Sequence, residues 1–413
     1  MRASDSHPQF PSKVREYTNF AVRGITKICK EIGPRPCGSE AERKAQEYMM
    51  NEWKTCADEA RLEEFETHPG AFMGWFKIDA VLLVIAIILS VLGLPQFALI
   101  PIAIAIVILA GEFLFYRELT DVFYPKKTSC NTVAVRKAAG ETKRRIIFAG
   151  HIDSSYEWRP TYYGGKVLLF ATFGYAIVGL VYLLVISIVG LILPEENSVV
   201  NILQWVSLAF VPAFIFLFFF LSGKTVAQGA NDNLTGVFAG AAVMKYMADN
   251  DLRFENTELV CMATGGEESG LRGAKAYMKA HAEEIKSSGI ETVFIAVDTL
   301  RDYETQAVYA KDMSGITKHD KRACHLLKKA GELCGLKMEF SSVYAGASDA
   351  AAVTQAGVPA TCYAAMDPGP PRYYHTRLDT WDNMDRKTIE KGVEVLINTA
   401  YLFDEKGLCE SYD

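Results

Sequence analysis

Four long apolar segments interrupt an otherwise charged sequence, and they limit the folds that this chain can adopt. The clearest pair is Val167 to Leu193, uncharged over 27 residues, and Ile202 to Leu221, uncharged over 20. A helix of about 20 apolar residues spans the hydrocarbon core of a bilayer. A buried helix with no charge over such a length would be unusual in a soluble domain of this size. We therefore predict a transmembrane hairpin here.

The first apolar pair is shorter. Ile78 to Leu94 and Phe97 to Tyr116 are divided by Pro95-Gln96, and each has an apolar core of about 15 residues. Those cores are short against the roughly 20 residues that a span needs. We predict a second spanning hairpin, and a re-entrant or interfacial hairpin is the alternative.

Two hairpins give an even number of crossings, so every other segment lies on one side of the membrane. Basic residues flank the spans on that side: Lys77, Arg117, Lys126, Lys127, Arg159, Lys166 and Lys224. The opposite side carries Glu195 and Glu196 and no Lys or Arg. The positive-inside rule therefore places the remaining chain in the cytoplasm. Nine scattered cysteines without a CxxC pair, and an N-terminus without an apolar signal segment, agree with this expectation.

Outside the apolar segments, strand and helix patterns alternate, which predicts an α/β fold with a mostly parallel central sheet covered by helices on both faces. Expected strands are 132–135, 145–149, 259–263, 292–297 and 359–363, with a weaker one at 60–67. Expected helices are two within 12–54, then 235–248, 270–286, 319–334 and 386–404. The second helix within 12–54 begins with a capping box, in which Ser39 caps the helix and Glu42 reaches back.

These patterns divide the chain into a catalytic domain and two insertions. The catalytic segments are 1–72, 117–166 and 222–413, and the membrane hairpins are 73–116 and 167–221. The net charge of −6 and the absence of a basic stripe or phosphate-binding loop argue against a nucleic-acid partner. The lipid bilayer is the expected partner of the four helices, and the sequence leaves the oligomeric state open.

Polar residues with metal-binding chemistry follow the predicted strands, where functional groups of parallel sheets collect. They are His151 and Asp153 after 144–150, Glu267 and Glu268 after 259–263, Asp298 after 293–297, Asp232 before the helix at 235, and His375 in a late loop. Each alone has a structural alternative: a surface pair for the two glutamates, a helix cap for Asp232, a turn for Asp298. Together, two histidines and three carboxylates match the mixed nitrogen and oxygen ligation that zinc accepts.

Two features of this set point to hydrolysis. Asp153 is placed to accept the second N–H of the His151 imidazole, which would fix its tautomer. Adjacent loop residues point in different directions, so Glu268 can bind a metal while Glu267 faces a bound water. A di-metal site acidifies that water, and a free carboxylate moves its proton to the leaving amine. The pattern therefore predicts metal-assisted hydrolysis of peptides.

A series of short motifs carries a family resemblance. They are Ile32-Gly-Pro-Arg-Pro36, Gly38-Ser-Glu40, Gly150-His-Ile-Asp-Ser154, Gly229-Ala-Asn-Asp-Asn233, Gly265-Gly-Glu-Glu268, Val297-Asp298, Ala347-Ser-Asp-Ala350, Gly357-Val-Pro-Ala360 and Tyr374-His-Thr376 with Asp379-Thr380. In this order they resemble the co-catalytic di-zinc aminopeptidases, a family that includes bacterial leucyl aminopeptidases, plasma glutamate carboxypeptidase and glutaminyl cyclase.

The resemblance implies the zinc-peptidase fold, two Zn²⁺ ions and a role for each residue. One zinc would be held by His151 and Asp298, the other by Glu268 and His375. Asp232 would bridge the ions, and Glu267 would be the general base. Tyr344 would correspond to a tyrosine that steadies the tetrahedral intermediate.

The chain departs from the family in its two hairpins. The second hairpin lies between His151 and Asp232, which are 81 residues apart. We expect it to leave the domain close to the metals, where it could cover the cleft. Two other functions stay open. A glutaminyl-cyclase-like acyltransferase can work with a single zinc, and a non-catalytic membrane scaffold on the same fold would typically lose ligands, whereas none of the five is missing here.

Overall fold

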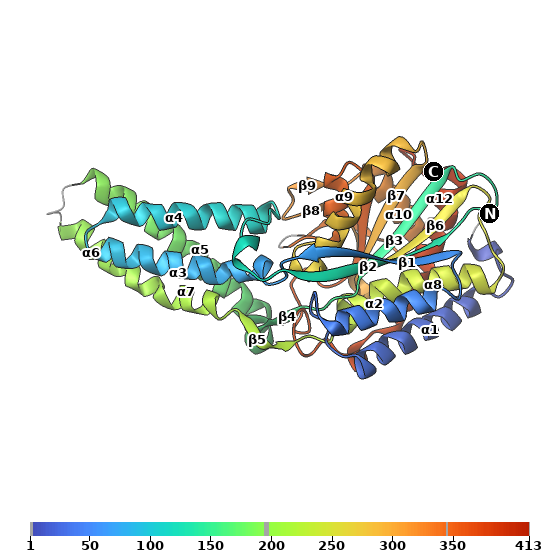
Figure 1. The fold of residues 1–413 in the computed structure, drawn as a ribbon, viewed down its shortest axis with the longest axis horizontal. Coiled ribbons are helices and arrows are strands. Elements are labelled where there is room, and N and C mark those ends of the chain that lie inside the picture. The colour runs from blue at the N-terminus through green and yellow to red at the C-terminus, as the bar shows by residue number, and fades with distance from the viewer. Residues whose placement is uncertain (1–2, 194–197, 344–345, 413) are drawn as a thin grey trace.

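The computed structural model describes residues 3–193, 198–343 and 346–412, and it has two parts (Figure 1). An α/β domain holds both chain termini, and a bundle of apolar helices extends from its opposite end. Both helical insertions therefore leave the α/β domain and return to it. This arrangement is the one expected for two hairpins inserted into one domain.

A mixed sheet forms the centre of the α/β domain, with the order β1-β2-β6-β3-β7-β11-β8-β10 and with β9 beside β8. The four middle strands run parallel: β6 (Thr257–Thr264), β3 (Arg144–His151), β7 (Glu291–Leu300) and β11 (Ala360–Ala365). The outer strands are β1 (Glu59–Thr67), β2 (Lys127–Arg136), β8 (Gln306–Asp312), β9 (Thr317–Lys318) and β10 (Glu339–Ser342). Within this sheet, the antiparallel pairs among the described residues are β1–β2, β2–β6, β11–β8 and β8–β9.

Helices cover both faces of this sheet, which explains why the middle strands are continuous apolar runs. In β3, Ile146 and Phe148 pack into the core on one face, and Ile147 and Ala149 pack into the core on the other. The first face is covered by α1 (Phe10–Glu31), α2 (Glu40–Trp53), α8 (Thr235–Asp249), α10 (Lys321–Leu333) and α12 (Arg386–Lys406). The second face is covered by α9 (Arg272–Ser287) and α11 (Asp349–Gln355). The predicted α/β fold is confirmed.

The shorter edge elements were not expected from the sequence. They are β8, β9, β10 and α11, together with a two-stranded ribbon of β4 (Tyr156–Trp158) and β5 (Leu221–Val226). None of them is longer than seven residues, and such segments carry too few residues to show a periodic pattern.

One half of the predicted capping box is wrong. Ser39 does cap α2, because its hydroxyl accepts the Glu42 N–H at 3.1 Å. The Glu42 carboxylate does not return to Ser39 and accepts instead from the backbone N–H of Gly38 at 2.7 Å and of Gly266 at 3.1 Å. Gly266 directly precedes Glu267, so the side chain at this helix start holds a loop that is distant in sequence.

The apolar bundle consists of four helical segments that are long and apolar enough to cross a membrane: Ala71–Val91, Pro95–Leu114, Arg159–Ile192 and Ser198–Phe218. The first is α3; the second is α4 (Pro95–Leu109) continued by a π-helical turn, Ala110–Leu114; the third is α5. The fourth is α6 (Ser198–Val206), a 3-10 turn (Ser207–Phe210) and α7 (Val211–Phe218). The first two helices reach 21 and 20 residues because they extend beyond the apolar cores.

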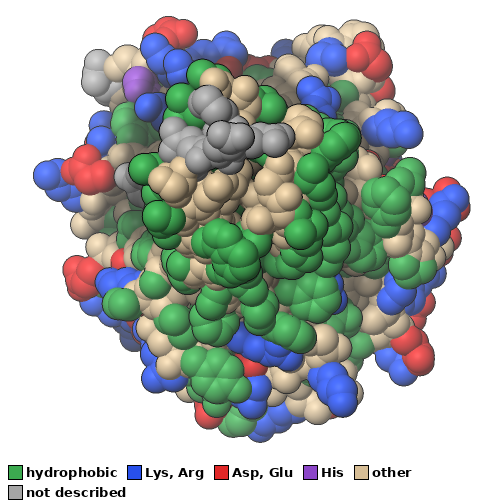
Figure 2. All heavy atoms as spheres, turned by 90° about the vertical axis from the view of Figure 1, so that its left-hand side faces the viewer, with side chains coloured by type: hydrophobic (Ala, Val, Ile, Leu, Met, Phe, Trp, Pro, Cys, Tyr) green, Lys and Arg blue, Asp and Glu red, His purple; other side chains and the backbone are tan. Residues whose placement is uncertain are grey.

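The outer surface of this bundle is apolar. Seen along the long axis of the molecule, its hydrophobic side chains form a continuous patch, and Lys, Arg, Asp and Glu side chains surround it on the wider domain behind (Figure 2). Val107 and Ile177 are examples, 62% and 53% exposed. A monomeric soluble protein rarely exposes a contiguous apolar surface of this kind. By length, composition and surface, the four helices are therefore suited to cross a membrane.

Two glycines let α8 approach the ends of β3 and β7. A Cβ atom on Gly150 would lie 2.5 Å from the backbone nitrogen of Val237, and one on Gly236 would lie 2.2 Å from the carbonyl oxygen of Val297. Both contacts involve backbone, which cannot move aside by changing rotamer. This close approach brings the segment before α8 next to the carboxyl ends of the strands.

We expect Gly150→Ala to lower the free energy of unfolding by about 1–3 kcal/mol, because the added methyl group overpacks the contact between β3 and α8. Thermal unfolding of the purified protein in detergent measures the change. Gly174→Ala in α5 is the matched control, since nothing beyond the nearby backbone of its own helix lies within 4 Å of its Cβ position. Equal melting temperatures for the two variants would contradict the packing argument.

Candidate metal centre

The predicted site residues come from neighbouring strand ends and converge. His151 is the last residue of β3, and Asp298 lies near the end of the adjacent β7. Glu267 and Glu268 follow β6, which lies on the other side of β3. Asp232 lies in the turn before α8, and His375 lies in the loop after β11. Because β6, β3, β7 and β11 are parallel neighbours, their carboxyl ends meet at one edge of the sheet.

The Asp232 carboxylate lies between the two imidazoles. Its Oδ1 is 3.0 Å from Nε2 of His151, and its Oδ2 is 3.1 Å from Nε2 of His375. His375 Nε2 is also 3.2 Å from Oε1 of Glu268. The side chains of His151, Asp232 and His375 are all buried. Each oxygen of one carboxylate thus faces a different histidine, the arrangement expected of a bridging ligand.

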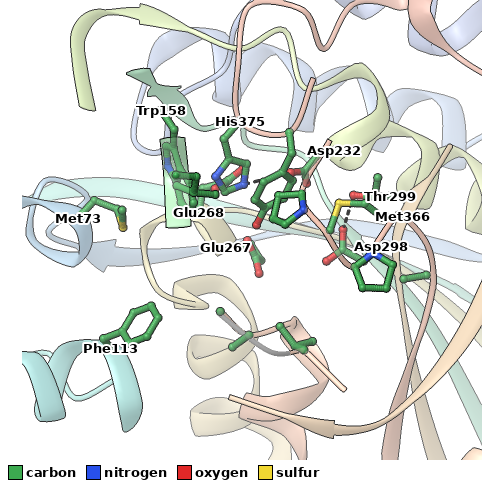
Figure 3. Close-up of a pocket in the computed structure, with 18 of the residues that line it drawn as sticks. Met73, Phe113, Trp158, Asp232, Glu267, Glu268, Asp298, Thr299, Met366 and His375 are labelled. Atoms are coloured by element: carbon green, nitrogen blue, oxygen red, sulfur yellow. Dashed lines mark hydrogen bonds and ion pairs between the residues drawn. The ribbon is translucent and has the colours of Figure 1, made fainter. Parts of the chain in front are cut away.

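Two further carboxylates complete the cluster around His151. Oε2 of Glu267 lies 3.7 Å from His151 Nε2, and Oδ1 of Asp298 lies 4.0 Å from the same nitrogen. The candidate ligand atoms of His151, Glu267 and Asp298 are within 4.8 Å of one another, and so are those of His151, Asp232 and Glu268. The structure therefore brings together all five predicted ligands and the predicted base. Figure 3 shows all of them except His151 under their labels.

The donor set fits a metal such as zinc. Oδ2 of Asp232 and Oε1 of Glu268 are buried without a well-aligned hydrogen bond, and both face Nε2 of His375, at 3.1 and 3.2 Å. One imidazole nitrogen cannot satisfy two buried carboxylates, whereas a cation between them would satisfy both. Imidazole nitrogens combined with carboxylate oxygens are the ligands of zinc sites in hydrolytic enzymes.

The electrostatics of the cluster reflect crowded, buried acids. Burial and the neighbouring Asp232 raise the pKa of Asp298 to about 7, and burial raises the pKa of Glu267 well above its ordinary value. Burial alone would lower the pKa of His375, but the carboxylates of Glu268 and Asp232 raise it to about 10. Several acids in one buried volume repel one another, so the arrangement favours bound positive charge.

Asp153 has a different role from the one predicted. Its carboxylate Oδ1 lies 3.6 Å from Nδ1 of His151, too long for a hydrogen bond, and the Asp153 carbonyl oxygen lies 3.2 Å from that nitrogen. The carboxylate accepts the backbone N–H of Glu267 at 3.0 Å and of Glu268 at 3.1 Å. Asp153 therefore positions the loop that carries the two glutamates. Its carbonyl oxygen and, at ion-pair distance, its carboxylate also face the imidazole.

Two buried residues that the sequence did not assign to a role hold the Asp232 turn. Asp379 accepts from the backbone N–H of Asn231 at 2.8 Å and of Asp232 at 3.1 Å, and from the Asn231 side chain at 2.7 Å. Arg35, fully buried, donates to the carbonyl oxygens of Ile152 at 2.7 Å and Gly229 at 3.0 Å. It thereby joins the segment after His151 to the segment before Asp232. The sequence signal was available, because both residues lie within the quoted motifs.

The predicted Tyr344 lies outside the described residues. Three other tyrosines, Tyr116, Tyr309 and Tyr374, line the cavity beside the cluster. The Tyr374 ring stacks on the His375 imidazole with centroids 3.8 Å apart, and Trp158 packs edge-on against the same imidazole at 4.5 Å. These rings fix the orientation of His375. No sequence pattern indicated the role of Trp158.

A cavity of about 150 Å³ adjoins the acidic cluster. The acidic side chains and His375 form one side of it, and Met73 and Phe113 face them across the opening (Figure 3). Side chains of both apolar hairpins line this opposite side. The expected proximity of the second hairpin to the cleft is confirmed, and the first hairpin contributes as well.

Comparison with known proteins supports the resemblance seen in the motifs. The family model described as "Peptidase family M28" matches residues 217–400. This segment contains Asp232, Glu267, Glu268, Asp298 and His375, and the structure adds His151 from outside it. No curated protein matches the amino-acid sequence.

Solved structures share the fold at low identity. The aminopeptidase from Aneurinibacillus sp. strain AM-1 matches with a TM-score of 0.56 and 14% identity over 95% of each chain. BSAP, a zinc aminopeptidase from Bacillus subtilis, matches with a TM-score of 0.56 and 13% identity over 93% of this chain and 94% of that one. Fimbriiglobus ruber glutaminyl cyclase matches with a TM-score of 0.53 and 14% identity over 92% of this chain and 94% of that one. The predicted family resemblance is confirmed, and these structures show that the fold is that of the aminopeptidases.

We expect Asp153→Asn to loosen the loop of Glu267 and Glu268, because an amide nitrogen would replace one of two acceptor oxygens that face backbone N–H groups. A hydrogen bond to a charged group contributes about 1.5–3 kcal/mol, and the melting temperature should fall accordingly. Hydrogen exchange of the loop amides, followed by mass spectrometry, should become faster. Asp251→Asn, at an exposed position, is the control, and unchanged exchange in Asp153→Asn would refute this positioning role.

Proposed function

We propose, from the match to peptidase family M28 and the fold shared with zinc aminopeptidases, that this chain is a membrane-anchored zinc-dependent aminopeptidase. The observation that carries the proposal is the Asp232 carboxylate between two histidines, at 3.0 and 3.1 Å, with further acids around it. The M28 resemblance supports a peptidase, and the proximity of the five predicted ligands and Glu267 supports metal-dependent hydrolysis.

In this proposal the site holds two zinc ions. His151 and Asp298 would bind one, Glu268 and His375 the other, and Asp232 would bridge them. The proximity of each histidine to a different oxygen of Asp232 supports the bridging role. Zinc bound by these residues would polarise the substrate carbonyl and acidify the attacking water.

Glu267 would act as the general base and acid. It lines the cavity, and its backbone is fixed by Asp153, so its carboxylate can stand beside a water without moving the loop. It would accept a proton from the water as the oxygen attacks the carbonyl carbon, and then deliver that proton to the leaving amine nitrogen. The products would be a free amino acid and a peptide shortened by one residue.

The proposed removal of single N-terminal residues rests on the fold shared with the aminopeptidase structures. The cluster of carboxylates would also attract the ammonium group of an N-terminus.

We expect Glu267→Gln to lower kcat by about 10²–10⁴-fold, the range for loss of a general base. Hydrolysis of aminoacyl anilides and dipeptides by the purified chain, with and without a chelator, measures this. Glu283→Gln on the exposed surface of α9, where the Glu283 side chain is 92% exposed, serves as the matched control and should retain full activity. Full activity in Glu267→Gln would reject the assigned base.

Metal content distinguishes this variant from a misfolded one. Mass spectrometry should find two zinc ions per chain in both the wild type and Glu267→Gln, because the side chain is not a proposed ligand. A single zinc with conversion of N-terminal glutamine to pyroglutamate would instead favour the cyclase alternative. Intact metal content without any amide hydrolysis would favour the scaffold.

The proposed orientation places the α/β domain in the cytoplasm, as the basic residues beside the spans predict. Eight of the nine cysteines are buried and Cys409 is half-buried, so a Cys409→Ser background suits thiol labelling. In intact cells, a membrane-impermeant maleimide should label Ser198→Cys at the start of α6 and should not label Ser287→Cys on α9. Both serines are exposed, and the reverse labelling pattern would overturn the orientation.

A further inference from the structure

The side of the cavity opposite the acidic cluster is an apolar wall that the α/β domain does not provide. The first hairpin and the turn after it contribute Met73, Phe76 and Phe113, and the second contributes Leu169, Phe170 and Phe173. All six belong to the helices that are long and apolar enough to cross a membrane. We call these six residues the hairpin wall.

The basic residues beside the hairpin wall give its depth. Lys77 directly follows Phe76, and Lys166 precedes Leu169 and Phe170 by three and four residues. With a rise of about 1.5 Å per helical residue, Leu169 and Phe170 lie about 5–6 Å deeper than Lys166. Lysines at the ends of spans mark the membrane surface. Phe76 and Met73 precede Lys77 on α3 and lie about 1.5 and 6 Å on its domain side. The hairpin wall therefore lies on both sides of the level of these lysines, at the depth of the lipid headgroups.

The hairpin wall also borders the lipid-facing surface. Phe170 lines the cavity and is 52% exposed on α5, next to the exposed Leu168. In the four-helix bundle, exposed apolar side chains of this helix face acyl chains. The apolar end of the cavity is thus separated from the bilayer by the Phe170 side chain.

A row of aromatic rings connects the hairpin wall to the metal centre. Phe76 packs on Phe220 with centroids 5.0 Å apart, Phe220 packs on Trp158 at 5.0 Å, and Trp158 packs on His375 at 4.5 Å. Edge-to-face aromatic packing of this kind is favourable and directional. The apolar wall and the polar centre are therefore parts of one fixed site.

We propose that the substrates are peptides that partition into the membrane, with the scissile amide at the acidic cluster and an adjacent apolar side chain or alkyl group against the hairpin wall. This inference rests on the proposed function and adds its substrate class. A polar peptide from the cytosol leaves the hairpin wall uncovered, whereas an apolar one replaces contact with lipid by contact with six apolar side chains. The substrate reaches the site laterally, at the depth of the headgroups.

The test uses the full chain in vesicles of phosphatidylcholine and phosphatidylglycerol, with two series of short peptide amides. One series lengthens the linear side chain of the N-terminal residue from alanine through norvaline and norleucine to 2-aminooctanoate, and the other lengthens the residue that follows it. Burial of one methylene raises binding about fourfold. We expect kcat/KM to rise about fourfold per methylene in at least one series and then to reach a plateau.

A pair of variants on α3 separates binding at the hairpin wall from simple enrichment in the membrane. Met73→Trp fills part of the cavity and should move the plateau to shorter side chains. Val81→Trp, on the same helix at a position that is 48% exposed and outside the cavity lining, should leave the plateau in place. Phe170→Ala removes an exposed ring from the hairpin wall and should move the plateau to longer side chains. This variant tests the same inference if Met73→Trp does not fold.

The outcomes are distinct. A plateau that moves with Met73→Trp or Phe170→Ala, and not with Val81→Trp, supports the inference. Two flat series in an enzyme that hydrolyses alanyl peptides overturn the inference and leave the proposed function standing, as does a plateau that none of these variants moves. Absence of hydrolysis of every peptide by the zinc-loaded wild type overturns the proposed function itself.

Discussion

The structure depends on a buried carboxylate, Asp232, held between two histidines. A charge removed from water is destabilising unless opposite charge or hydrogen bonds surround it. Its Oδ1 and Oδ2 face His151 and His375, and its backbone is fixed by Asp379. His151 comes from β3, and His375 and Asp379 come from the loop after β11. The carboxylate is therefore satisfied only when β3, this loop and the turn before α8 are all in place. Formation of the site and formation of the domain are therefore one event.

The hairpins fit this architecture because they leave the domain beside the functional edge. The ribbon of β4 and β5 closes the base of the second hairpin, and the Trp158 backbone N–H donates to the His375 carbonyl oxygen at 2.8 Å. An insertion in such a connection need not disturb the sheet, since loops tolerate added length at small entropic cost. The same position makes the membrane helices part of the cavity.

Much of the candidate site could be predicted because parallel strands end at one edge. Residues that follow successive buried strands must then be neighbours, which brought His151, Glu268 and Asp298 together from the sequence alone. Side-chain direction was not predictable in the same way. Asp153 is two residues from His151, yet its carboxylate bonds the Glu267 and Glu268 N–H groups. Glu42 likewise turns from its own helix start to Gly266. Local spacing cannot show a competing partner that only the fold brings near.

By itself the sequence determined the α/β class, the four apolar helices, their even number and the identity of the candidate ligands. Each of these follows from periodicity, composition or residue chemistry, which are local properties. The tertiary structure alone decided that both hairpins, and not one, border the metal centre, and that Trp158, Arg35 and Asp379 support it. Those contacts join segments that are distant along the chain, and their formation depends on how whole elements pack. No pattern within one segment encodes such packing.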